Sequence, residues 1–281
     1  MKRFLAVPFG LVAASFVLAD AKPIDPVSAK LTKAKAVYAA DLAKLDKEMA
    51  DAFAKAETTA RKKGDKAVLD RLKPELVSYE LTGALPNWSS PAVAKKRAAA
   101  RAALEPAYAL AVREYTKAGD DKAAGAVQKE LDRLKAQAIP VRCFTLVNVK
   151  SGLALATGKD DADRGGGLVQ EKSAGKPHQQ WTFVPNGAAQ VYLVRNRQSG
   201  HFINIGGAHR AGLQVTLWSF DAAEHNHWLV AREGAHYRLK AAAGDHFIAP
   251  ADASTDAGVA VVQVLKGNGD EQFWTLTPVT E

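Results

Sequence analysis

All seven histidines of this 281-residue chain lie in its second half, where they are the side chains best suited to metal binding or acid–base chemistry. They are His178, His201, His209, His225, His227, His236 and His246. None has metal-ligand spacing together with a partner that would orient its ring. The acidic run 160–163 precedes three glycines, but it lacks the spacing and the bidentate Glu of a calcium loop. The sequence therefore predicts no metal and no cofactor, and a surface loop at the acidic run.

Catalysis would need a constellation that the chain does not offer. The first half is Ala-rich and helical, without the acid–base carboxylate pair in a cleft that glycoside hydrolysis requires. Cys143 is the only cysteine, which excludes an intramolecular disulfide, and we interpret it as a small apolar strand residue. We therefore predict that the protein is not an enzyme.

The first 21 residues have the features of an export signal. Lys2 and Arg3 precede an apolar run from Phe4 to Leu18, and small residues suited to a signal peptidase follow. The run is shorter than the ~20 residues that span a bilayer as a helix. We predict a cleaved signal peptide over residues 1–21 and a secreted or periplasmic, cell-envelope location. Retention of the segment as an anchor is the alternative.

Residues 22–138 are rich in strong helix formers. Asp25-Pro26 and Ser90-Pro91 each place a capping residue before a proline, which favours a helix start. Gly64 ends the first long helix, and Pro74 is expected to interrupt or bend the second. A second pair of helices follows with similar local sequences. The prediction is two helical hairpins, each with a long arm and a shorter return arm, packed as an antiparallel bundle or an extended pair.

The basic character of the chain belongs to this helical part. Residues 22–138 contain 23 Lys and Arg against 16 Asp and Glu, whereas residues 139–281 contain 13 of each. The lysines alternate with acidic residues, as on a solvated helix face, and no basic cluster is interleaved with aromatics. We therefore predict no nucleic-acid partner. Loose attraction to a polyanionic cell-envelope surface stays open, and the helices are the expected contact of any homo-oligomer.

Residues 139–281 repeat one pattern three times. Each copy opens on an aromatic residue and a strand–turn–strand alternation, and closes on a tryptophan. The closing residues lie 47 and 46 positions apart, in the triplets Gln179-Gln180-Trp181, Asn226-His227-Trp228 and Gln272-Phe273-Trp274. A fixed period of this length indicates a small unit repeated around a shared core.

This pattern resembles the ricin-type β-trefoil lectin domain, whose three repeats each end near a Q-x-W triplet. The resemblance covers about 140 residues and implies twelve short strands with pseudo-threefold symmetry. The expected fold class is therefore multi-domain α plus β, with antiparallel helical hairpins over 22–138 and an all-β trefoil over 139–281. The triplet tryptophans are expected in the common core.

The resemblance also implies where a sugar would bind. An active repeat of this family carries an Asp after its first hairpin turn, an aromatic residue that stacks on the sugar, and an Asn-Gln pair at the triplet. The matching residues are Ala156, Lys172 and His178-Gln179 in the first copy, Asn204, Trp218 and His225-Asn226 in the second, and Ala249, Leu265 and Glu271-Gln272 in the third. Only the second copy keeps a polar group and an aromatic residue. Trp218 is thus expected to be a stacking platform, or alternatively to cap the hydrophobic base.

The second copy therefore leads the predicted carbohydrate-binding residues, with amides of the other copies added. They are Asn204, Trp218, His225, Asn226, Gln170, His178, Gln179, Gln263 and Gln272. The predicted function is an exported, non-catalytic lectin-like protein whose trefoil is carried on a helical stalk, with a glycan or polysaccharide as partner. The alternative is a protein-interaction scaffold with a degenerate trefoil and helices that mediate assembly.

Overall fold

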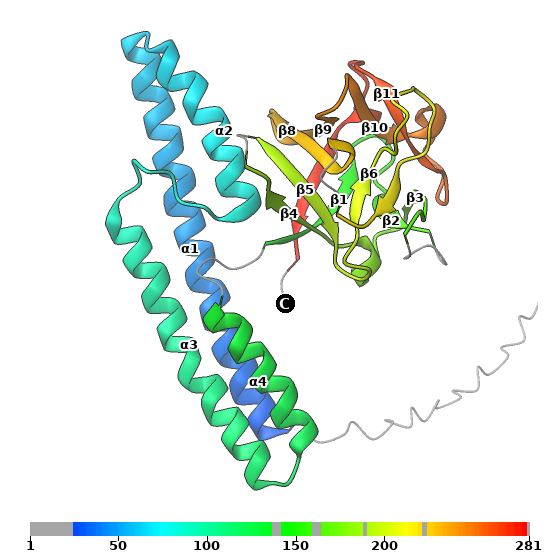
Figure 1. Cartoon of the computed structure of the whole chain (residues 1–281). Helices are drawn as coiled ribbons and strands as arrows, with labels where there is room; N and C mark the ends of the chain where they lie inside the picture. The colour runs from blue at the N-terminus through cyan, green and yellow to red at the C-terminus, as the bar shows by residue number, and fades with distance from the viewer. Residues whose placement is uncertain (1–24, 137–141, 159–163, 188–189, 221–223, 280–281) are drawn as a thin grey trace, which may run out of the picture.

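The computed structural model describes residues 25–136, 142–158, 164–187, 190–220 and 224–279. The predicted signal segment, the 138/139 domain boundary and the acidic run 160–163 lie outside these ranges. Four helices come first, and all the strands follow them (Figure 1). The helices are α1 Pro26–Lys63, α2 Lys66–Thr82, α3 Pro91–Lys117 and α4 Asp121–Ala136. In the part of the chain described here, no helix is long and apolar enough to cross a membrane.

The helix ends follow the local chemistry of the sequence. Asp25 accepts a hydrogen bond from the N–H of Val27 at 2.9 Å, and Asp65 accepts one from Val68 at 3.0 Å. Gly64 ends α1 with φ +65°, a left-handed conformation that glycine adopts without strain. Pro74 does not interrupt α2, so that part of the expectation was wrong. Packing on both sides of Pro74 holds the helix together, because Leu72 and Val77 are buried in different cores.

The helices form a long arm built around α1 and α3, which lie side by side (Figure 1). At one end α2 completes a three-helix core with α1 and α3, and Met49, Phe53 and Tyr79 lie buried within it. At the other end α4 completes a second core, which contains Leu31 and Leu131. The predicted long and short arms are confirmed. Each short helix covers one half of the long pair.

The strands form a closed ring with three hairpins attached. Antiparallel pairing runs from β1 to β4, β5, β8, β9 and β12 and back to β1. The pairs β2–β3, β6–β7 and β10–β11 make the hairpins. The strands are β1 Cys143–Asn148, β2 Ala154–Thr157, β3 Leu168–Glu171, β4 Trp181–Pro185, β5 Val191–Asn196, β6 Phe202–Asn204, β7 Thr216–Trp218, β8 His227–Glu233, β9 His236–Ala241, β10 His246–Pro250, β11 Val261–Leu265 and β12 Trp274–Pro278. This arrangement is a β-trefoil, as the sequence predicted.

The three triplet tryptophans lie in the common core, as expected. Trp181, Trp228 and Trp274 are fully buried, and each indole N–H donates to a main-chain carbonyl of its own repeat. The acceptors are Leu155 at 3.0 Å, Ile203 at 3.0 Å and Ile248 at 3.3 Å. The same contact therefore fixes the second strand of every repeat to its closing tryptophan.

Helix α2 covers the end of the barrel at which the repeats begin. Its residues Val77 and Leu81 belong to the same buried cluster as Phe144, Tyr192 and Tyr237, the opening aromatics of the three repeats. Figure 1 shows α2 beside β4, β5 and β8, and the structure records contacts of α2 with β4 and β8. The core of the trefoil thus includes side chains from the helical half.

Polar contacts surround this apolar contact between α2 and the barrel. Glu80 accepts hydrogen bonds from the Tyr237 hydroxyl at 2.6 Å and from Arg232 at 2.7 Å. Arg142 donates to the carbonyl of Glu80 at 3.0 Å and also binds the carboxylate of Asp46 on α1. The trefoil is therefore joined to two helices of the arm.

Candidate functional site

The β6–β7 hairpin of the second repeat carries the leading candidate residues. Its register pairs Phe202 with Trp218, Ile203 with Leu217 and Asn204 with Thr216. Residues directly opposite in an antiparallel pair point to the same side. Ile203 and Leu217 are buried in the core, so Phe202, Asn204, Thr216 and Trp218 share the other face.

The register corrects the repeat position assigned to Trp218. In the first repeat Leu155 pairs with Gln170, and in the third Ile248 pairs with Gln263, so both glutamines occupy the position of Leu217. Trp218 therefore corresponds to Glu171 and Val264, and Ser219 is the residue that corresponds to Lys172 and Leu265. The sequence comparison matched residue type and was wrong by one position. Trp218 still lies on the outer face of the hairpin, beside the position at which family members stack a sugar.

Two further aromatic rings lie on this hairpin. Phe202 and Phe220 meet edge to face, with ring centroids 6.2 Å apart. Phe220 is 56% exposed, whereas Trp218 and Phe202 are half-buried. Phe220 was not among the predicted site residues. The only signal in the sequence was its place two residues beyond Trp218, just past the end of the strand.

A side chain from the first repeat lies over Trp218. The guanidinium carbon of Arg164 is 4.1 Å from the centroid of the indole ring. The backbone beside it is fixed to β7, because Gly165 donates to the carbonyl of Leu217 at 2.8 Å and Leu217 donates to Gly166 at 2.8 Å. The outer face of β6–β7 is thus built from two repeats. Sequence reasoning missed Arg164 because 54 positions separate it from Trp218.

The polar residues predicted for the second repeat lie deeper than the aromatics. Asn204 is 3% exposed, and its side-chain oxygen accepts a hydrogen bond from the N–H of Gly206. Asn226 is fully buried, and its amide has no hydrogen-bond partner among the described residues. His225 is half-buried, and its carbonyl accepts from Ile205 at 3.1 Å. The structure brings these residues together on or beside the hairpin, but the side chains of Asn204 and Asn226 are covered by the rest of the chain.

Gln170 and Gln263 fasten neighbouring repeats to each other. Gln170 donates to the carbonyls of Ser254 and Asp256, both at 2.9 Å. Gln263 donates to Ile205 at 3.1 Å and Ala208 at 3.2 Å. Both side chains are fully buried. Their amides hold the loops of the adjacent hairpins.

Gln179 and Gln272 close the loop that precedes each triplet. Gln179 donates to the carbonyl of Lys172 and accepts from Ala174, each at 2.8 Å. Gln272 makes the same two bonds, at 2.9 Å each, with Leu265 and Gly267. In both repeats the amide is therefore used within the chain.

A shallow depression of about 390 Å³ lies at the first repeat. Two predicted sugar-binding residues, His178 and Gln179, line it. The Nε2 atom of His178 lies 3.2 Å from a carboxylate oxygen of Glu171. The lining residues are Glu171, Lys172, Ala174, Lys176, His178, Gln179, Ala257 and Gly258. No Phe, Tyr or Trp lines this depression, so it lacks a large ring on which a sugar could stack.

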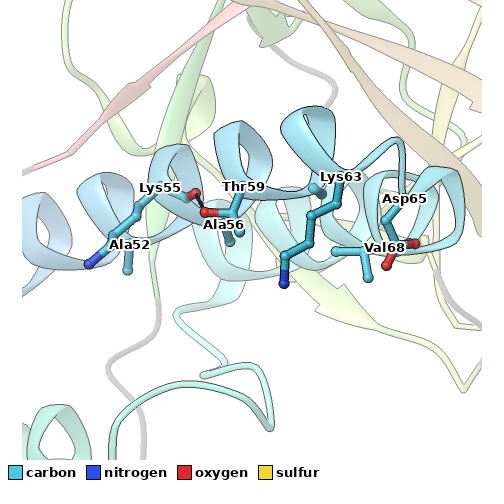
Figure 2. A pocket seen from close by; sticks show the side chains of 8 residues that line it. Ala52, Lys55, Ala56, Thr59, Lys63, Asp65 and Val68 are labelled. Atoms are coloured by element: carbon cyan, nitrogen blue, oxygen red, sulfur yellow. Dashed lines mark hydrogen bonds between the residues drawn. The ribbon is translucent and has the colours of Figure 1, made fainter.

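A second depression, of about 420 Å³, lies on the helical arm and contains none of the predicted residues. Figure 2 shows its side chains projecting from α1 and from the beginning of α2. They are Ala52, Lys55, Ala56, Thr59, Ala60, Lys63, Asp65 and Val68. The hydroxyl of Thr59 donates to its own helix, at the carbonyl of Lys55. Half of the lining residues are alanine or valine, and the other half are two lysines, a threonine and an aspartate.

Within the described ranges, no group of three or more His, Cys, Asp or Glu side chains is arranged to hold a metal ion. The largest shifts in pKa also lie away from the hairpins. Burial and a hydrogen bond to Asp46 raise the pKa of Tyr79 to about 12. Burial and the hydrogen bond to Glu80 raise the pKa of Tyr237 well above its usual range. These tyrosines belong to the junction between the arm and the trefoil.

The barrel, the three hairpins and the buried tryptophans define the C-terminal half as a β-trefoil. Residues 135–218 match the family model described as ricin-type beta-trefoil lectin domain-like. The match covers the first repeat and strands β5 to β7 of the second. A comparison with curated proteins found no match.

Several solved structures are similar to about half of the chain. The designed threefold-symmetric protein ThreeFoil is 26% identical, with a TM-score of 0.47, over 49% of this chain and 99% of that one. The exo-β-1,3-galactanase 1,3Gal43A of Clostridium thermocellum is 24% identical, with a TM-score of 0.47, over 50% of this chain and 30% of that one. The Macrolepiota procera ricin B-like lectin, solved with lactose, is 20% identical, with a TM-score of 0.42, over 48% and 93%.

Proposed function

We propose that this protein is a non-catalytic, lectin-like protein that binds a glycan on the outer face of the β6–β7 hairpin. The observation that carries this proposal is the cluster of Phe202, Trp218 and Phe220 on a hairpin of a lectin-like domain. Aromatic rings pack well against the C–H face of a pyranose. Phe220 is more than half exposed, so its ring is accessible to a ligand.

Hydroxyl groups are available beside these rings. Thr216 and Ser219 are half-buried at the outer face and the end of β7. A hydroxyl both donates and accepts hydrogen bonds, which suits sugar hydroxyls. Asn204, by contrast, uses its oxygen to hold Gly206, so its part in the proposal is to shape the turn. The proposed surface therefore combines aromatic stacking with hydroxyl contacts.

Retention of the purified protein on a panel of immobilised neutral and acidic polysaccharides tests this proposal. Phe220→Ala and Trp218→Ala should each weaken retention on the best ligand by about fivefold, since an aromatic contact contributes on the order of 1 kcal/mol. Val37→Ala is the matched control, because Val37 is 56% exposed, as Phe220 is, and lies on α1 outside the trefoil. An equal loss of retention in all three variants would show that the effect is not specific to the β6–β7 hairpin, and the binding site would then lie elsewhere.

The second candidate is a protein-interaction scaffold, and one observation favours it. Ala156 and Ala249 are buried at the positions where an active repeat would carry Asp, so two of the three repeats lack that group. An exposed aromatic cluster also suits a protein partner. Failure of the wild-type protein to bind any polysaccharide in the panel would favour this candidate.

Export and a stalk-like role for the helices are further parts of the proposal. The N-terminal sequence pattern supports export, and sequencing of the mature protein should find an N-terminus near Lys22. An intact leader would contradict cleavage.

The proposed arm joins the trefoil through α1 and α2, and any self-assembly should occur through the helices. Light scattering of the full protein measures this, and a monomer at all concentrations would exclude assembly.

A further inference from the structure

The aromatic surface of the second repeat includes a cationic side chain, Arg164. Arg164 is an exposed residue, and its guanidinium lies 4.1 Å from the centre of the Trp218 ring. We propose that the Arg164–Trp218 pair makes this surface selective for acidic sugars, whose carboxylate binds the guanidinium while the sugar ring packs on the exposed aromatics. This inference rests on the proposed carbohydrate-binding function.

The position of Arg164 is set by the fold. Residues 165–167 bond to β7 at three successive places, through Gly165 and Gly166 to Leu217 and through the bridge between Gly167 and Thr216. The backbone at 164 is thus held at the edge of the strand that carries Trp218. A side chain fixed in this way loses less freedom when it binds a ligand than a free surface arginine does.

The contact between the guanidinium of Arg164 and the indole of Trp218 does not use the N–H groups of the guanidinium as hydrogen-bond donors. A guanidinium that lies over an aromatic ring uses its flat face, whereas its N–H groups point outward in its own plane. Among the described residues, no carboxylate forms an ion pair with Arg164 and no acceptor receives a hydrogen bond from it. Two parallel N–H groups match the two oxygens of a carboxylate, which favours a uronic acid over the corresponding neutral sugar.

The same geometry disfavours a neutral sugar on Trp218. Arg164 covers the indole, so a neutral pyranose has to displace the cation in order to stack there. Phe220 is the more exposed ring and lies against Phe202, on the same hairpin. An acidic sugar therefore has two complementary contacts, with Phe220 as the ring surface and Arg164 as the charge.

The test must separate this recognition from general attraction to polyanions, because the chain carries a net charge of +8. Single sugars on an uncharged carrier achieve this, in the matched pairs galactose with galacturonate and glucose with glucuronate. Binding of the full protein is measured at physiological ionic strength, where contacts between distant exposed charges are screened. Thermal unfolding of each variant confirms that it is folded.

The wild-type protein should bind one of the two acids about tenfold more tightly than its neutral partner, as expected for a charge-assisted bidentate contact. Arg164→Gln should remove this preference without weakening binding of the neutral sugar. Arg210→Gln is the control for charge, because Arg210 is also exposed but lies in the β6–β7 loop, which bonds to the third repeat through Gln263.

Three results would overturn the inference. One is an unchanged preference in Arg164→Gln, and another is an equal loss in Arg210→Gln, which would indicate general charge attraction. The third is tighter binding of neutral sugars by Arg164→Gln, with no preference for acids in the wild type, which would make Arg164 a cover for Trp218. In that third case the proposed lectin function stands. If neither acids nor neutral sugars bind, the lectin function itself fails.

Discussion

The hydroxyl of Tyr237 donates a hydrogen bond of 2.6 Å to the carboxylate of Glu80, a residue 157 positions earlier in the chain. Tyr237 opens the third repeat of the trefoil, and Glu80 lies on α2. The same carboxylate also pairs with Arg232 at 2.7 Å. One side chain of the helical arm therefore fixes two neighbouring barrel strands, β8 and β9.

Breaking this contact should weaken the junction without unfolding either half. Tyr237→Phe should lower the free energy of unfolding by about 1–2 kcal/mol, because a buried hydrogen bond to a charged group is lost. Urea denaturation of Tyr237→Phe, Glu80→Gln and the double variant measures the coupling of the pair. Additive effects in the double variant would show that the two side chains do not stabilise one another.

The junction should also make stability fall at high pH. Burial, followed by the hydrogen bond to Asp46, raises the pKa of Tyr79 from 10.0 to about 12, so the folded protein holds this proton more tightly than the unfolded chain. Its stabilising contribution is complete below pH 10 and is lost as pH rises from 10 towards about 12. Urea denaturation at several pH values in this range measures the decrease. Tyr79→Phe should make the dependence shallower, and an unchanged slope would argue against Tyr79 as its source.

The triplet tryptophans should matter for stability and Trp218 should not. Trp228→Phe replaces the buried indole with a smaller ring and removes the hydrogen bond to the carbonyl of Ile203. We expect the free energy of unfolding to fall by about 2–4 kcal/mol. Trp218→Phe should change stability by less than about 1 kcal/mol, because the side chain is half-buried at the surface. Chemical denaturation followed by circular dichroism compares the two. A similar loss in both would mean that Trp218 supports the core.

Asn226 is a position at which a substitution should stabilise the second repeat. Gln179 and Gln272 each close their loops with two hydrogen bonds, whereas Asn226 is one methylene shorter and its buried amide has no partner in the described part of the chain. Asn226→Gln should therefore stabilise the protein by about 1 kcal/mol. The midpoint of urea denaturation measures the change. Destabilisation would indicate that the site has no room for the longer side chain.

The fold was largely predictable because its determinants are local or periodic. Capping residues such as Asp25 and Asp65 make their bonds within three positions, so the sequence alone locates the helix starts. The tryptophans recur at a nearly constant interval, and each makes the same contact in the structure. The packing of α2 against the barrel was not predictable. Val77 and Leu81 have the spacing of any buried helix face, and nothing in that spacing says which core they enter.

The candidate site was less predictable because it depends on register and on distant contacts. Trp218 was aligned by residue type, and only the pairing of Ile203 with Leu217 shows its true position in the repeat. Its contact with Arg164 joins two repeats through space. Gln170 and Gln263 were predicted as sugar ligands, but their amides bond to main-chain carbonyls of adjacent loops. Polar residue type alone does not distinguish a ligand-binding amide from a structural one.

The bond between Arg142 and Asp46 has a mechanical consequence, because Asp46 lies close to the middle of α1 rather than at either end. The trefoil is therefore attached to the side of the helical arm, and the half of the arm that contains α4 extends away from it (Figure 1). An α-helix of 38 residues is about 57 Å long. The two ends of α1 therefore lie on opposite sides of the point at which the trefoil is attached.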